Sequence, residues 1–182
     1  LIQSGGALNG TSAVVATNVG STGVATITGA GSQWTNSGNV TVGSLGSGGL
    51  SVLDGGLISG NNGSIGANAG SIGTVTVKNA GSQWTSSGTL TIGSVGSGTL
   101  SVLNGGMVSS ANGYVGANTG GNGTVTVDGS GSTWTSSGTI YLGNVGAGSM
   151  TLSNSGTASA TTTYVGTNSG SSGTLLIQSG GG

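Results

Sequence analysis

The chain has 182 residues, of which 44 are glycine, and only three are charged, namely one lysine and two aspartates. It contains no cysteine, histidine or proline, so disulfide bridges are excluded and no imidazole or thiol can serve catalysis. A net charge of −1 provides no basic patch for nucleic acid, and no apolar run approaches the roughly 20 residues of a membrane helix. A glycine-rich, uncharged chain is typical of a flexible linker, yet the hydrophobic residues here are regularly spaced, which favours a folded protein.

The chain consists of internal repeats. The segment GSQWTNSG at 31–38 returns in near-copies as GSQWTSSG at 81–88 and GSTWTSSG at 131–138, which places Trp34, Trp84 and Trp134 at intervals of 50 residues. Glycine halves this period to 25. One glycine column is Gly23, Gly48, Gly73, Gly98, Gly123, 148 and 173, and a second is 6, 31, 56, 81, 106, 131, 156 and 181. Such columns predict turns that need a positive φ or a close backbone approach.

Each 25-residue unit contains three predicted strands. In the unit that begins at Gly73 they cover about 74–77, 82–86 and 89–92, where small or β-branched apolar residues alternate with hydroxyl residues. A lone unit of this kind cannot bury its apolar face, but stacked units can. The sequence therefore predicts an all-β fold: one domain over 1–182, a right-handed parallel β-solenoid of about seven triangular coils in a 50-residue double repeat. Each residue is expected above its equivalent 25 positions earlier, at about 4.8 Å.

The predicted core consists of apolar columns that follow the same period. Its members include Val75, Val77, Leu100, Val102, Leu90 and Val115. Trp34, Trp84 and Trp134 are also expected to point inward, because the intervening coils carry Ser59 and Ser109 at that column and large beside small fills a core. In the alternative, the tryptophans form an outward ladder that stacks on sugar rings. Ile58 and Val108 favour this alternative, since at a 25-residue spacing they would otherwise face solvent.

Asparagines mark a further column. Asn18, Asn68, Asn118 and Asn168 alternate with Gly43, Gly93 and Gly143. Both residue types tolerate left-handed φ, so these positions are predicted turns, and stacked asparagines are expected to form a side-chain ladder. The column of Asp54, Asn79, Asn104 and Asn154 is interpreted in the same way.

The chain offers little for chemistry. Asp54 and Asp128 are its only side-chain carboxylates, and at three coils apart they cannot flank one scissile bond. We therefore expect no enzyme activity, no cofactor and no metal site. The candidate ligand surfaces are a hydroxyl face around Thr74, Thr76, Thr124 and Thr126, which suits ice, and exposed aromatics such as Tyr114, Tyr141 and Tyr164, which suit glycans.

The units at 73–98 (GTVTVKNAGSQWTSSGTLTIGSVGSG) and 123–148 (GTVTVDGSGSTWTSSGTIYLGNVGAG) resemble a known bacterial repeat. They are similar to the GST-W repeat of type V autotransporter passengers and of some surface proteins with a PEP-CTERM sorting signal. The resemblance covers essentially the whole chain. It implies export, a right-handed β-helical passenger on a Gram-negative cell surface, and a role in adhesion or as a stalk.

The leading hypothesis is an extracellular structural rod that self-associates end to end, as a filament subunit or as a segment of a longer chain. The surface carries little charge to oppose association, no capping unit is visible, and the opening LIQSGG at 1–6 returns at 176–181. A long tandem chain would give the same signature. The alternatives are an adhesin passenger that binds glycans or a cell surface, and an ice-binding protein. No nucleic-acid partner and no membrane insertion are expected.

Overall fold

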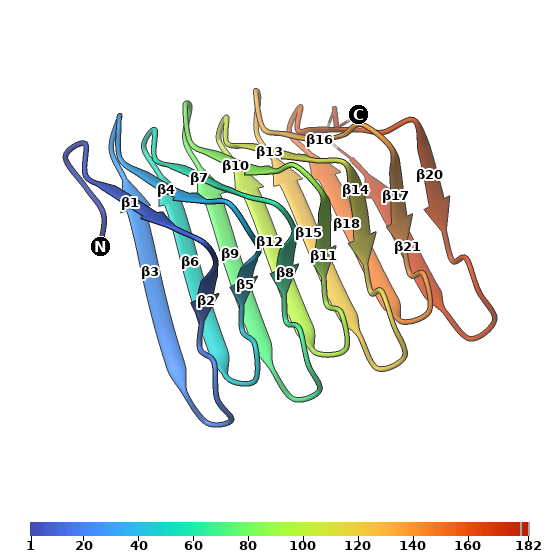
Figure 1. Ribbon diagram of the computed structural model, residues 1–182. Helices are drawn as coiled ribbons and strands as arrows, with labels where there is room; N and C mark the ends of the chain where they lie inside the picture. The colour runs from blue at the N-terminus through green and yellow to red at the C-terminus, as the bar shows by residue number, and fades with distance from the viewer. Residues whose placement is uncertain (179, 182) are drawn as a thin grey trace.

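The computed structural model describes residues 1–178, 180 and 181, and every regular element among them is a β-strand. The strands form three parallel sheets of seven strands each, and one strand of each sheet makes up a coil of the solenoid (Figure 1). The predicted β-solenoid of seven coils is thus confirmed.

The sheets differ in strand length. Sheet A holds the long strands β3 (Thr22–Thr28), β6 (Ser47–Leu53), β9 (Ile72–Lys78), β12 (Ser97–Leu103), β15 (Asn122–Asp128), β18 (Ala147–Ser153) and β21 (Ser172–Ile177). Sheet B holds β1 (Ala7–Gly10), β4 (Gln33–Asn36), β7 (Leu57–Gly60), β10 (Gln83–Ser86), β13 (Met107–Ser110), β16 (Thr133–Ser136) and β19 (Thr157–Ser159). Sheet C holds β2 (Ala13–Val15), β5 (Val40–Val42), β8 (Gly63–Ile65), β11 (Thr89–Ile92), β14 (Asn112–Val115), β17 (Thr139–Leu142) and β20 (Thr162–Val165).

The expected 25-residue register holds only in sheet A, where Leu100 pairs with Val75 and Val125. In sheet B the spacing alternates between 26 and 24 residues, so that Gln83 pairs with Leu57 and Met107. In sheet C it alternates between 27 and 23. Leu90 there pairs with Gly63 and Gly113, and Val115 pairs with Ile92 and Leu142. The prediction that Leu90 and Val115 share one column was therefore wrong, although both are buried.

The corners between sheets explain these shifts. We call the coils that contain β4, β10 or β16 tryptophan coils. Residues 79–82 link sheets A and B before the tryptophan strand β10, whereas three residues, 104–106, do so before β13. The corner between sheets B and C is also one residue longer in the tryptophan coil. The corner between sheets C and A is two residues shorter there. The differences cancel, so every coil keeps 25 residues and the sequence alone conceals the shift.

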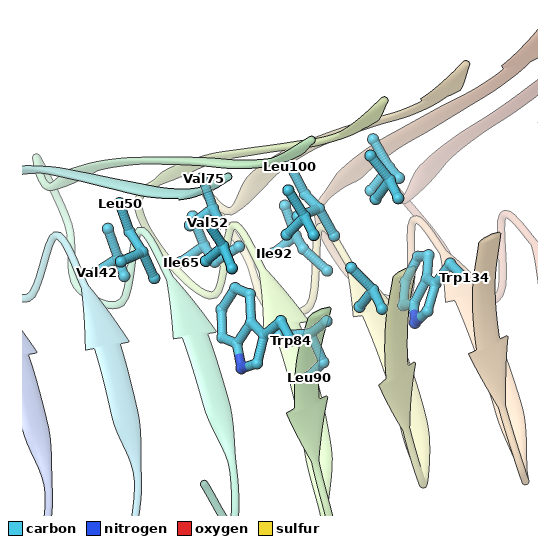
Figure 2. Packing of buried hydrophobic residues seen from close by; sticks show 14 of the residues in the cluster. Val42, Leu50, Val52, Ile65, Val75, Trp84, Leu90, Ile92, Leu100 and Trp134 are labelled. Atoms are coloured by element: carbon cyan, nitrogen blue, oxygen red, sulfur yellow. The ribbon is translucent and has the colours of Figure 1, made fainter. Parts of the chain in front are cut away.

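One continuous core runs through all three sheets. Val75, Val77, Leu90, Leu100 and Val102 are fully buried within it. Figure 2 shows the inward side chains of sheets A and C close to the rings of Trp84 and Trp134. The alternation of buried and half-exposed residues along the strands of the inner coils, as in β11, is what a two-residue period produces.

Candidate interaction surfaces

The tryptophans belong to the core. Trp84 and Trp134 are fully buried, and Trp34, nearer the N-terminal end, is partly buried against the same cluster. The outward tryptophan ladder is therefore not formed. Ile58 and Val108 are the register partners of Trp84 and are also buried, because the extra corner residue shifts sheet B by one position.

The small partners of the tryptophans differ from those expected. Ser59 and Ser109 pair with Thr85 on the outer face of sheet B. The space for the indole comes instead from sheet C of the preceding coil. A Cβ atom on Gly63 would lie 2.8 Å from Trp84 Cζ2, and a Cβ atom on Gly113 would collide with the ring of Trp134.

The first glycine column marks a close approach. The predicted turns there were wrong, because each of these glycines is the second residue of a sheet A strand. The column of Gly23, Gly48, Gly73, Gly98 and Gly123 has no positive φ. A Cβ atom on Gly73 would collide with the carbonyl oxygen of Val42, and one on Gly98 with that of Ile65. Sheet A thus passes so close to the neighbouring corner that a side chain does not fit.

The glycines of the second column do not occupy equivalent backbone positions in successive coils. Gly31, Gly81 and Gly131 have φ near +80°, whereas Gly56 and Gly106 do not have positive φ. Gly55 and Gly105 take the equivalent left-handed positions in the alternate coils, because the corner is one residue shorter there.

The two asparagine columns have different roles. Asp54, Asn79, Asn104 and Asn154 have positive φ between 49° and 72°, as predicted. Asn18, Asn68, Asn118 and Asn168 lie in the corners between sheets C and A, so the predicted turns are confirmed. Positive φ occurs in this column only at the alternating Gly43, Gly93 and Gly143 and not at the asparagines, so the prediction of left-handed asparagines was wrong. The expected ladder is also replaced, since the side chains of Asn68, Asn118 and Asn168 bond to the shorter corner of the preceding coil. The Asn68 amide donates to the Ser44 carbonyl oxygen at 2.8 Å, and the Asn168 amide donates to that of Asn144 at 2.7 Å.

The outer side of sheet A carries two hydroxyl columns, which we call the hydroxyl face. Across β9, β12, β15 and β18 the columns are Thr74, Thr99, Thr124 and Ser149, and Thr76, Ser101, Thr126 and Thr151. All eight side chains are exposed or half-exposed. The columns are interrupted beyond these strands by Val24 and Gly49 at one end and by Leu176 at the other.

The outer side of sheet C carries a tyrosine stack. The ring centroids of Tyr114 and Tyr141 are 4.6 Å apart with an interplanar angle of 11°, and those of Tyr141 and Tyr164 are 5.3 Å apart at 17°. Burial, together with the neighbouring phenol of Tyr141, raises the pKa of Tyr114. The spacings of 27 and 23 residues hide Tyr141 from a search at 25, which is why the sequence did not indicate the stack.

The corners between sheets C and A alternate in length along the rod. The six-residue corners at 16–21, 66–71, 116–121 and 166–171 alternate with four-residue corners at 43–46, 93–96 and 143–146, and the longer loops project further in Figure 1. A hollow of about 360 Å³ lies between two long corners, above Val145, and is lined mainly by glycine and small polar residues.

The two aspartates stabilise corners. Asp54 accepts a hydrogen bond of 2.6 Å from the Asn79 amide. Asp128 accepts bonds from the Ser153 hydroxyl at 2.6 Å and the Asn154 amide at 2.8 Å, and these bonds lower its pKa. Across the described ranges we find no group of three or more histidine, cysteine, aspartate or glutamate residues that could hold a metal ion.

No protein-family model, curated protein or solved structure matches this chain. The resemblance to the GST-W repeat, with the export and surface location that it implies, therefore stays a prediction. In the part of the chain that the structure describes, no helix is long and apolar enough to span a bilayer.

Proposed function

We propose that this chain is a non-catalytic structural rod of the bacterial cell surface, which joins further solenoid coils end to end. The observation that carries the proposal is that all three sheets run through the whole rod and finish at the same two ends. Their outermost strands are β1, β2 and β3 at one end and β19, β20 and β21 at the other. The edge of a strand is a template for another strand, so each end can extend three sheets at once.

At the C-terminal end, the core side chains of this chain and of a second copy are complementary in size. If the sheet registers continue, the second copy's Leu8 lies over Ala158, in the column that holds Trp134 one coil earlier. The second copy's Ala25 lies over Leu175 in sheet A. At both places a large side chain meets a small one, as close packing requires. Lys78, Asp54 and Asp128 belong to internal coils, so no charged side chain is buried at this junction.

One segment opposes the junction. The Ile2 amide donates to the Thr26 carbonyl oxygen at 2.8 Å, and the Thr28 amide donates to the Ile2 carbonyl oxygen at 2.9 Å. Residues 1–2 therefore cover half of the outer edge of β3. Leu176 and Ile177 have the same sequence as residues 1–2. In a joined pair, Leu176 and Ile177 of the preceding copy would have to occupy the edge of β3 that residues 1–2 now cover.

The test is negative-stain electron microscopy with sedimentation over a concentration series, for the full chain and for a variant that lacks residues 1–6. We expect filaments that form at lower concentration in the shortened variant. Val165→Lys should abolish them, because Val165 faces the core column at the C-terminal end and is 47% exposed there. Thr174→Lys adds the same charge on the outer face of sheet A and is the matched control. Isolated short rods at all concentrations in both chains would refute end-to-end assembly.

The hydroxyl face supports ice binding as a second candidate function, because eight hydroxyl side chains form two regular columns over four strands. Thermal hysteresis at high concentration would support it, and Thr99→Lys should then abolish the effect. Glycan binding by exposed aromatics has less support, since the tryptophans are inside and the tyrosine rings turn their faces toward one another.

A further inference from the structure

We propose that the tyrosine stack is a site of oxidative cross-linking, at which Tyr141 becomes joined to Tyr114 or Tyr164 by a carbon–carbon bond. The site is independent of the end-to-end assembly proposed above, because all three residues belong to one chain. The modification would staple neighbouring coils of the solenoid to each other.

The backbone holds the three rings together. Tyr114, Tyr141 and Tyr164 are direct register partners on β14, β17 and β20. Parallel strands fix such partners at about 4.8 Å, and the ring centroids, at 4.6 and 5.3 Å, keep that spacing. Two radicals formed in this stack do not need to diffuse before they meet.

The stack is also where an oxidant would act first. These are the only three tyrosines of the chain, which has no cysteine. Trp84 and Trp134 are fully buried and Trp34 is partly buried, whereas Tyr164 is 48% exposed. Phenols with an ordinary pKa of about 10 are protonated at neutral pH, and the pKa of Tyr114 is raised further, so oxidation removes a hydrogen atom from a neutral O–H group.

The chemical step needs a one-electron oxidant, for which we name a haem peroxidase with hydrogen peroxide. Each of two phenols loses one electron and one proton, which gives two phenoxyl radicals. The ortho carbons of the two rings then couple, and both rings regain aromaticity as their ortho hydrogens move to the phenol oxygens. One peroxide molecule takes up the two electrons and two protons and leaves as two water molecules.

The cross-link would strengthen the contacts between coils. Coils are otherwise held to one another by backbone hydrogen bonds and side-chain packing. The stack spans three successive coils, of which β20 belongs to the last described one. A covalent bond from Tyr141 to Tyr164 prevents this coil from separating.

The experiment treats the purified full chain with horseradish peroxidase and hydrogen peroxide at low protein concentration. We expect a monomeric product that has lost two hydrogen atoms by mass, shows dityrosine fluorescence, and gives an elastase fragment in which two peptides are joined through their tyrosines. Oxidation of the half-exposed Met107 adds mass and is therefore distinguished.

Three single variants separate the stack from chance coupling. Tyr141→Phe leaves Tyr114 and Tyr164 two strands apart, at roughly 9.6 Å, and should lose the monomeric product. Tyr114→Phe and Tyr164→Phe each retain one stacked pair and should keep it. Phenylalanine preserves the ring stack, and circular dichroism checks that all three variants are folded. The proposal is overturned if wild type gives no cross-link, if Tyr141→Phe gives as much as wild type, or if the product is only a concentration-dependent dimer.

Discussion

The indole of Trp84 lies over Gly63 of the preceding coil, in a space that only a missing side chain leaves open: a Cβ atom at Gly63 would be 2.8 Å from Trp84 Cζ2 and 2.6 Å from Leu90 Cδ1. The 50-residue period of the chain follows from this relationship. A coil with tryptophan in sheet B needs a coil with a small residue in sheet C beneath it, so two kinds of coil alternate.

Gly63→Ala should therefore destabilise the protein by about 1–3 kcal/mol, the usual cost of overpacking a core. Chemical denaturation measures the change. Gly49→Ala is the matched control, because the nearest atom to its new Cβ is 3.7 Å away, and a compatible Gly→Ala change stabilises by about 0.4–1 kcal/mol.

The partner in this relationship can be tested by a double-mutant cycle. If the indole is what Gly63 makes room for, Gly63→Ala should cost less in a Trp84→Leu background, with a coupling energy of about 0.5–3 kcal/mol. Additive effects of the two changes would show that the ring and the glycine do not share the space.

The two buried indoles differ in their polar contacts, which gives a second prediction. Trp134 Nε1 donates a hydrogen bond of 3.2 Å to the Ser110 hydroxyl, whereas Trp84 Nε1 has no partner, because Gly60 replaces Ser110 in that coil. Ser110→Ala should cost about 1–3 kcal/mol, since it leaves a buried N–H unpaired. Ser109→Ala, on the outer face of the same strand, should change the free energy of unfolding little. Equal effects would contradict the role of this bond.

The sequence alone was sufficient to predict the solenoid, its seven coils and the core residues of sheet A, because a period of two along each strand decides which side chains face inward. It did not place Ile58 and Val108 in the core beside inward tryptophans. It was not sufficient for the register. The corners of the two kinds of coil differ by one, one and two residues in compensating directions, so a strict count of 25 matched Trp84 with Ser59 instead of Ile58.

The same compensation hid the tyrosine stack. Tyr114 and Tyr164 are 50 residues apart, so a 25-residue count places them in one column, while Tyr141 falls outside it. The shift of two positions between β14 and β17 brings all three into register. A search for columns sheet by sheet, allowing each corner its own length, would have found it.

Tryptophan accessibility provides a third prediction. Trp34 is only partly buried, whereas Trp84 and Trp134 are fully buried. Acrylamide should therefore quench a minor part of the fluorescence, and Trp34→Phe should remove most of that part. Trp134→Phe is the control and should leave the quenched part unchanged. Quenching of all three tryptophans would return support to the outward ladder.

The acid sensitivity of the rod should depend on Asp128. The hydrogen bond from the Ser153 hydroxyl, followed by that from the Asn154 amide, holds the pKa of Asp128 below its ordinary value. A carboxyl whose pKa is lowered in the folded state contributes stability above its unfolded pKa, about 3.9, and this contribution is lost as the pH falls through the lower folded value. Melting temperatures from pH 7 to pH 2 should thus fall less in Asp128→Asn than in wild type, and Ser153→Ala should give an intermediate slope. An unchanged acid slope in Asp128→Asn would show that these bonds do not discriminate between the charged and neutral carboxyl.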